Sequence, residues 1–262
     1  MSEDFSGSTI PEDYDYKTPD HLIIWLDAHI GDPEKYHNLK KSFSSNIDPR
    51  NQTWTMLTGT DIDDLLRVGG PKPVKFGGVL VLLITFTDPN ACYQAFETYS
   101  NKRILFITSG TLGKHIVPRI LENFPQVFTD PVAKVPYNAI YVFCGYISAH
   151  IPWAMPFLDY ILMFNHETDL LLRMTCDMAK YYLTKADRLY ADGDLVSTRR
   201  TYGWSKKLFL QNQKMGGHCE VFINEVNRKA DIVENNIRSN RLNNTQDSNS
   251  SDDERSGCEP CS

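Results

Sequence analysis

Apolar runs alternate with helical patterns along most of this chain, and no other feature restricts its fold as strongly. Five runs are nearly continuous in apolar residues, as expected of strands buried on both faces: LIIWLDA (22–28), VLVLLITF (79–86), RILFITSG (103–110), AIYVFCG (139–145) and YILMF (160–164). Strands that alternate with helices form βαβ units. We therefore predict an α/β fold with an open, mainly parallel five-stranded sheet flanked by helices.

Similar turns introduce the first two helices. Asp32-Pro33 and Asp88-Pro89 each place a helix-capping side chain before a proline at the first helical position. A third helix is expected over 111–123, behind the third strand. In the first two helices, apolar residues recur at helical spacing: Tyr36, Leu39, Phe43 and Ile47, then Cys92, Phe96 and Tyr99.

The remaining segments define the domain organisation. Residues 48–78 interrupt the alternation and are predicted to form a surface insertion with a short helical piece at 61–68. After the fifth strand the pattern is helical, over 168–191, 195–214 and 218–239. We expect a disordered N-terminal segment (1–20), an α/β domain (21–166), a helical extension (167–239) and a disordered acidic tail (240–262).

Composition and charge exclude several classes of function. The chain has 262 residues, of which 41% are hydrophobic and 23% charged, and its formal net charge is -6. No run of Lys and Arg is longer than a pair, which argues against binding to nucleic acid or to an anionic membrane surface. The run 79–86 is too short to cross a bilayer, and the first twenty residues do not resemble a signal peptide. We therefore expect a cytoplasmic protein.

The six cysteines do not indicate a metal or redox site. Four of them, Cys92, Cys144, Cys176 and Cys219, lie in apolar contexts and are expected to be small buried residues in a reducing compartment. Cys258-Glu-Pro-Cys261 lacks the two further ligands that a zinc site needs, so these thiols are interpreted as incidental. We expect neither a bound metal nor a cofactor.

The turn Ser109–His115, SGTLGKH, resembles a phosphate-binding loop only superficially. A P-loop needs four residues between its glycines and a Ser or Thr after the Lys, whereas here two residues separate Gly110 from Gly113 and His115 follows Lys114. The third glycine of a dinucleotide-binding fingerprint is also missing. Two interpretations stay open: the amides that follow Gly110, together with Lys114, could hold an anion, or Ser109 or Thr111 simply caps a helix.

A candidate crevice lies at the carboxyl ends of the predicted strands, where open parallel sheets bind ligands. Asp27, Ser109 and His166 follow the first, third and fifth strands, and no other set of strand ends offers comparable polar groups. With Gly110, Thr111 and Lys114 they form the candidate ligand-binding residues. Each also has a structural explanation as a cap or loop residue, so no catalytic residue is assigned.

Four segments, LIIWLDA, ITFTDPNACYQAFETY, RILFITSGTLGKHIVPRI and AIYVFCG, resemble in that order a receiver/TIR-like Rossmannoid module of invertebrate multidomain proteins. This module often precedes ADP-ribosyltransferase or TPR regions, and the resemblance covers about residues 22–145. It implies a flavodoxin-, receiver- or TIR-like fold without an established catalytic role. Receiver domains carry a phosphoacceptor Asp after the third strand and a Lys after the fifth, where this chain has Ser109 and Asn165-His166.

These observations favour a non-enzymatic protein–protein interaction or signalling module whose receiver/TIR-like fold is degenerate. The alternative is a nucleotide- or NAD-binding or -processing enzyme that acts at the carboxyl ends of the strands. The first interpretation predicts a protein partner, and the second predicts anion or nucleotide binding.

The acidic tail offers one candidate modification site. Ser250 and Ser251 directly precede Asp252, Asp253 and Glu254 in a segment without apolar residues. A kinase that reads acidic residues downstream of serine would find its determinants here, and phosphorylation would add negative charge to the tail. The alternative is an unmodified segment that keeps the domain soluble.

Overall fold

A computed structural model describes residues 19–47, 54–56, 70–130 and 133–249 of the chain. Within these residues one eight-stranded sheet runs in the order β3-β2-β4-β5-β1-β6-β7-β8. Its strands are β1 (His21–Leu26), β2 (Phe43–Ile47), β3 (Trp54–Met56), β4 (Lys72–Phe76), β5 (Val79–Phe86), β6 (Arg103–Ser109), β7 (Ile140–Phe143) and β8 (Ile161–Phe164).

All five strands predicted from the apolar runs are present, and they are parallel to one another. They are β1, β5, β6, β7 and β8, and β1 lies between β5 and β6. Leu22 therefore pairs with Leu82 on one side and with Ile104 on the other. Every residue of β1 is buried, since neighbouring strands and helices enclose it completely. This position explains its continuous apolar run.

The predicted number of strands was too small, because three antiparallel strands extend the sheet beyond β5. Two of them, β3 and β4, lie inside 48–78, so the prediction of a mere surface insertion was wrong for these parts. Gly77 and Gly78 form a two-residue turn between β4 and β5 with φ of 56° and 80°. Glycine adopts this left-handed backbone readily, and the Gly-Gly pair between apolar runs is a hairpin signal. The helical piece predicted at 61–68 lies outside the described residues.

The first predicted helix is much shorter than its apolar spacing indicated. Helix α1 spans only His37–Lys41, and the next residues form strand β2. Phe43 is buried, and its ring packs 5.2 Å from the Phe76 ring and 6.5 Å from the Trp25 ring. Pairing with β4 and packing in this aromatic cluster outweigh the local helical spacing, which also fits a strand of this length.

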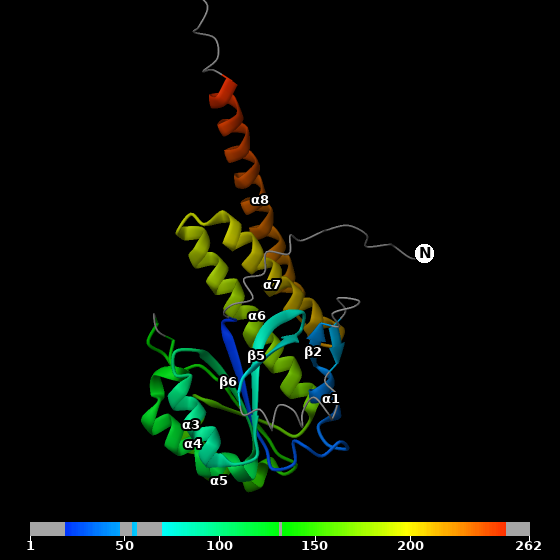
Figure 1. The fold of residues 1–262 in the computed structure, drawn as a ribbon, viewed down its shortest axis with the longest axis vertical. Helices are drawn as coiled ribbons and strands as arrows, with labels where there is room; N and C mark the ends of the chain where they lie inside the picture. The colour runs from blue at the N-terminus through cyan, green and yellow to red at the C-terminus, as the bar shows by residue number, and fades with distance from the viewer. Residues whose placement is uncertain (1–18, 48–53, 57–69, 131–132, 250–262) are drawn as a thin grey trace, which may run out of the picture.

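Helices cover both faces of the parallel strands (Figure 1). Helices α3 (Pro89–Thr98) and α4 (Gly110–Asn123) lie side by side on one face, and α1 contacts α6 (Glu167–Ala191) on the other. As predicted, Asp88 caps α3 by accepting a hydrogen bond of 2.8 Å from the Ala91 amide. Shorter pieces complete the connections: η1 (Pro125–Phe128), η2 (Ile147–Ala149), α5 (Ile151–Ala154) and η3 (Met155–Phe157).

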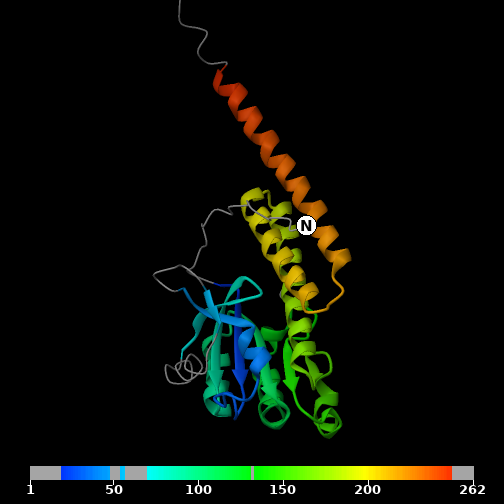
Figure 2. The ribbon, with the colours of Figure 1, turned by 90° about the vertical axis from the view of Figure 1, so that its right-hand side faces the viewer.

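The C-terminal part is helical, as predicted. Helix α6 forms a hairpin with α7 (Leu195–Lys214), and α8 (Glu220–Asn249) packs along α7 and then projects beyond the hairpin (Figures 1 and 2). The disordered tail predicted from residue 240 was wrong for residues 240–249, because they continue α8 without a Gly or Pro to end it. Ser250, Ser251, Cys258 and Cys261 lie outside the described residues.

Candidate functional site

The structure brings two predicted site residues together at the carboxyl edge of the parallel strands. Leu26 and Thr108 are paired neighbours on β1 and β6, so Asp27 and Ser109 leave adjacent strands side by side. The chain passes from β1 to β5, which lies on one side of β1, and then to β6, which lies on the other side of β1. This is the reversal of strand order at which α/β sheets bind ligands.

The Asp27 side chain is hydrogen-bonded within the turn that follows β1. Only 2% of the residue is exposed, and its carboxylate accepts a hydrogen bond of 2.7 Å from the His29 amide. Burial and the adjacent Asp27 carboxylate raise the pKa of the Tyr36 hydroxyl well above its usual value. Asp27 therefore fixes the turn after β1 and faces a tyrosine that stays neutral.

Ser109 and Gly110 begin helix α4 beneath a histidine ring. The Ser109 hydroxyl accepts a hydrogen bond of 3.5 Å from the Leu112 amide, which makes Ser109 the helix cap. A Cβ atom at Gly110 would lie 2.5 Å from Nε2 of His150. Trp153 holds that ring, since its Nε1 donates to Nδ1 of His150 over 3.2 Å. The His150 ring thus covers the start of α4 and requires glycine there.

The other three predicted residues are less closely associated. Thr111 and Lys114 are exposed on α4. His166 is exposed at the start of α6, and it follows β8, which β7 separates from β6. The structure therefore groups Asp27, Ser109 and Gly110, with Lys114 on the adjoining helix and His166 further along the edge.

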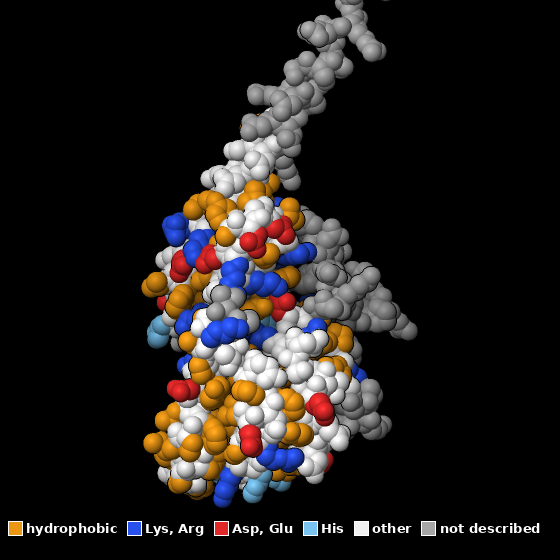
Figure 3. Space-filling view, turned by 90° about the vertical axis from the view of Figure 1, so that its left-hand side faces the viewer, with side chains coloured by type: hydrophobic (Ala, Val, Ile, Leu, Met, Phe, Trp, Pro, Cys, Tyr) orange, Lys and Arg blue, Asp and Glu red, His pale blue; other side chains and the backbone are white. Residues whose placement is uncertain are grey.

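Four large apolar side chains are exposed along the connection between β7 and β8. We call them together the crossover patch: Tyr146, Ile151, Met155 and Leu158, with Tyr146 82% exposed. Apolar side chains gather at the lower left of the face shown in Figure 3. Pro152 and Pro156 keep the helical pieces here short, so few of these side chains are drawn into the core. Scattered exposed apolar residues are common, but a group of large ones can mark an interaction site.

A cleft of about 820 Å³ lies at the opposite, amino edge of the sheet. The starts of β1, β6 and β7 form one wall, and α6 forms the other. We call it the amino-edge cleft. Lys and Arg side chains gather at mid-height of the face in Figure 3. The cleft is lined by six basic residues, Lys102, Arg103, Arg173, Lys180, Lys185 and Arg188, and by three acidic ones, Asp20, Asp130 and Asp177.

Arg103 occupies a distinctive position in this cleft. Its guanidinium carbon lies 4.0 Å from the centre of the Tyr137 ring and 4.4 Å from that of Tyr181. Among the described residues the guanidinium makes no hydrogen bond or ion pair. The two ring contacts restrain the guanidinium and leave its N–H donors uncommitted.

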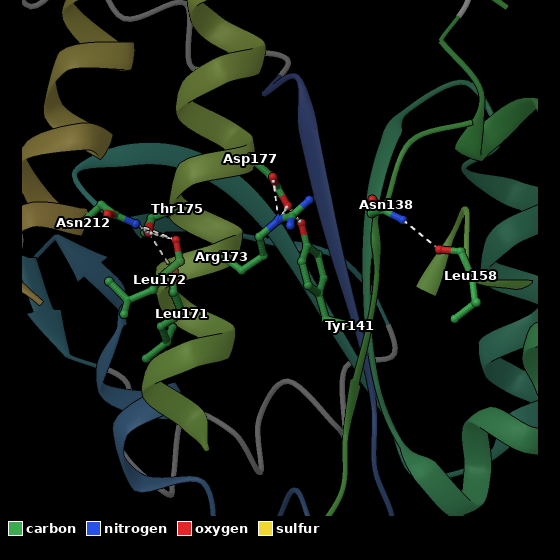
Figure 4. A network of polar contacts seen from close by, with 9 residues as sticks. All are labelled: Asn138, Tyr141, Leu158, Leu171, Leu172, Arg173, Thr175, Asp177 and Asn212. Atoms are coloured by element: carbon green, nitrogen blue, oxygen red, sulfur yellow. Dashed lines mark hydrogen bonds and ion pairs between the residues drawn. The ribbon is translucent and has the colours of Figure 1, made fainter. Parts of the chain in front are cut away.

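The acidic side chains of the cleft are paired with bases. Nε of Arg173 donates to both carboxylate oxygens of Asp177, at 2.9 and 2.8 Å, and the Tyr141 hydroxyl donates to the same carboxylate over 3.0 Å (Figure 4). Burial and Asp177 raise the pKa of Tyr141 well above its usual value. Lys185 is 2.7 Å from Asp20. The surplus of basic residues therefore makes the cleft electropositive.

A second polar group in Figure 4 has a structural role. Nδ2 of Asn212 on α7 donates to the Thr175 hydroxyl on α6 over 2.9 Å, and that hydroxyl donates to the Leu171 carbonyl over 2.7 Å. These bonds satisfy buried polar atoms between two helices and fix the α6–α7 hairpin.

His21, at the start of β1, borders the amino-edge cleft and is completely buried. Its Nδ1 lies 3.2 Å from the Tyr182 hydroxyl, and its Nε2 has no hydrogen-bond partner within the described part of the chain. Burial, with Arg103 and Lys185 nearby, lowers the pKa of His21 well below its usual value. The imidazole is therefore neutral at pH 7.

The sequence reasoning did not find the amino-edge cleft. Its basic residues are isolated in the chain and come together only when α6 packs beside the ends of β1, β6 and β7. One local signal was present: Lys102-Arg103 stands directly before a buried strand, where long basic side chains reach the sheet edge.

Neither a metal-binding cluster nor a membrane-spanning helix is present among the described residues. They contain no group of three or more His, Cys, Asp or Glu arranged to hold a metal ion. None of the described helices is both long enough and apolar enough to pass through a membrane. The cysteines expected to be buried are free thiols, and Cys92, Cys144 and Cys219 are buried while Cys176 is partly so.

Comparisons with known proteins found no matching family model, no matching curated protein and no matching solved structure.

Proposed function

We propose that this chain is a non-enzymatic protein–protein interaction or signalling module with a degenerate receiver/TIR-like fold. The order of its parallel strands supports this fold. When the parallel strands β1, β5, β6, β7 and β8 are numbered 1 to 5 along the chain, their order across the sheet is 2-1-3-4-5. Flavodoxin-like folds have this order.

The residues at the carboxyl edge favour a protein-binding role over phosphorelay or nucleotide chemistry. Ser109 stands where a receiver domain has its phosphoacceptor, and its hydroxyl caps α4. Asp27 accepts from the adjacent turn, and His150 covers Gly110. The groups that a phosphorelay or nucleotide site would use are thus engaged in local structure.

The exposure of the crossover patch is the observation that carries the proposal. Tyr and Met side chains are enriched at the apolar centre of protein interfaces. A partner that covers the patch would remove Tyr146 and Met155 from water. The partner is therefore expected to present a complementary apolar surface.

The test compares co-purification by the wild-type chain, a Tyr146→Ser/Met155→Ser variant and a Val221→Ser control. Val221 is 77% exposed on α8, away from the crossover patch. A partner retained by the wild type and the control, lost by the patch variant, and then bound saturably as a purified protein supports the proposal. Equal retention by the patch variant contradicts it.

The alternative function is nucleotide or NAD binding at the carboxyl edge. The adjacency of Asp27 and Ser109 at the reversal of strand order favours it. A thermal-shift series with nucleotides and NAD separates the two functions. Ligand at about a hundred times its Kd stabilises a protein by about 2.7 kcal/mol. Such a shift, abolished by Asp27→Ala in a folded protein, would replace the proposed function with the alternative.

A further inference from the structure

The amino-edge cleft has the size of a small-molecule site. Its volume is about 820 Å³, within the usual range for such sites. The sheet edge and α6 enclose it on two sides, so a ligand would lie between them. Its aromatic lining comes from Tyr137, Tyr141 and Tyr181.

The charges in this cleft favour an anionic ligand. Two of its three carboxylates are held closely by basic partners, Asp20 by Lys185 and Asp177 by Arg173, each pair within 2.8 Å. The third carboxylate, Asp130, accepts a hydrogen bond of 2.8 Å from the Ala133 amide and lies 3.8 Å from Arg188, which is within ion-pair distance but leaves the Arg188 donors available. Lys102 and Arg103 have no carboxylate partner within the described residues. An anion would therefore meet several donors and no uncompensated carboxylate.

Arg103 gives this cleft a preferred ligand geometry. Its guanidinium carbon lies within 4.4 Å of the centres of both the Tyr137 and the Tyr181 ring, and these contacts restrain the side chain before a ligand binds, which lowers the entropic cost of binding. A planar fork of donors matches two oxygens of one phosphate or carboxylate. Further basic side chains around it favour the group with more charge, which is a phosphate ester.

A buried polar atom beside the cleft is a second, independent observation. Nε2 of His21 is buried without a partner among the described residues, and His21 borders the same cleft. Buried polar atoms are rarely left unpaired in folded proteins. Such an exception calls for an explanation, and a binding site beside the residue is one.

We infer that the amino-edge cleft binds a small phosphorylated molecule whose phosphate is held by Arg103 with support from Lys102. This site lies at the opposite edge of the sheet from the predicted carboxyl-edge crevice. The inference goes beyond the proposed interaction function and does not depend on it.

Isothermal titration calorimetry on the full chain tests this site. The probes are ADP, ribose 5-phosphate and inorganic phosphate, with adenosine as the uncharged control and citrate as the carboxylate control. We expect saturable binding of at least one phosphorylated probe, weakening as salt is added, and no binding of adenosine. Citrate binding as tightly as every phosphorylated probe would overturn the assignment to phosphate esters.

Three Arg or Lys to Met variants locate the site. Arg103→Met should weaken binding by about tenfold or more, because it removes the paired charge-assisted hydrogen bonds to the phosphate. Lys102→Met should weaken binding less, because it removes only a supporting charge. Arg119→Met is the matched control, because Arg119 also stacks on a tyrosine, 4.5 Å from the Tyr93 ring centre, but lies on α4 outside the cleft. Circular dichroism confirms that each variant is folded.

The remaining outcomes are also decisive. No saturable binding of any phosphorylated probe up to millimolar concentrations overturns the inference. Loss of binding in Lys114→Met with binding retained in Arg103→Met places the anion at the carboxyl edge and supports the alternative function instead. If Arg103→Met does not fold, an unchanged Kd in Lys102→Met overturns the inference. None of these results alters the crossover-patch experiment.

Discussion

At the scale of single residues, the buried His21 links protonation to stability. Its pKa in the folded protein is lowered well below 6.5 by burial and by the charges of Arg103 and Lys185. Below about pH 6.5 the His21 imidazole is protonated in the unfolded chain but stays neutral in the folded protein. The free energy of unfolding therefore falls as the pH falls. Above that pH both states are neutral at this position, and the histidine adds no pH dependence.

His21→Phe should therefore flatten the acid side of the stability profile. Each pH unit between 6.5 and the lowered pKa costs the wild type up to about 1.4 kcal/mol at this residue, and the variant is spared that loss. Urea unfolding from about pH 7.5 to about pH 5.5 measures both slopes. His115→Gln, at an exposed position on α4, is the control with the wild-type slope. Identical slopes for the wild type and His21→Phe would contradict the prediction.

At the scale of elements, the described contacts that anchor α8 run from Phe222 to Ile237. Val226 and Val233 are buried, and the Phe222 ring stacks on Phe209 at 5.1 Å. An ion pair of 2.7 Å joins Lys229 to Asp187 on α6. Figure 2 shows the rest of the helix running clear of the hairpin. The buried apolar side chains described for α8 therefore lie toward its start.

Deletion of residues 240–262 should leave the melting temperature within about 2 °C of the wild type. Val226→Ala should instead lower the free energy of unfolding by about 2 kcal/mol, because it leaves a cavity between α7 and α8. The matched control is Val221→Ala on the exposed face of the same helix, with a change within about 0.5 kcal/mol. A loss of several degrees in the deletion variant would mean that the tail packs on the body of the protein.

At the scale of the whole molecule, α6 joins the sheet to the helical extension. It contacts β7, β8 and α1 on one side and α7 on the other. The Glu167 carboxylate accepts from the Leu39 amide over 2.7 Å, and Lys185 pairs with Asp20 before β1. Several of its side chains are buried in one continuous core with those of the sheet: Leu170, Leu171, Met174, Met178 and Tyr182. The two parts should therefore unfold together.

Thermal unfolding of the full chain is expected to give one transition, coincident in far-UV and near-UV circular dichroism. A chain ending at residue 166 lacks the helix that covers one face of the sheet, and it should show no cooperative melting. A cooperative transition in that shorter chain, or two separate transitions in the full chain, would show that the α/β domain and the helical extension are independent.

Local patterns allowed much of the fold to be predicted. The five parallel strands, the Asp88 cap and the bounds of α7 follow from residues close together in the chain. Phe43 was misassigned because its spacing fits a helix or a strand, and only contact with Phe76 decides between them. The Gly77-Gly78 turn was a readable signal that the sequence reasoning did not use.

By itself, the sequence determined the five parallel strands and the long helices that follow them, and it placed Asp27 and Ser109 at strand ends. Apolar periodicity and capping depend on neighbours within a few residues, so they can be read locally. Only the tertiary structure decided the antiparallel extension, the cover of His150 over Gly110 and the grouping of Arg103 with α6. These features depend on strand order and on contacts between segments that are distant in the chain. A single basic or aromatic residue in the sequence does not indicate which distant residues it will contact.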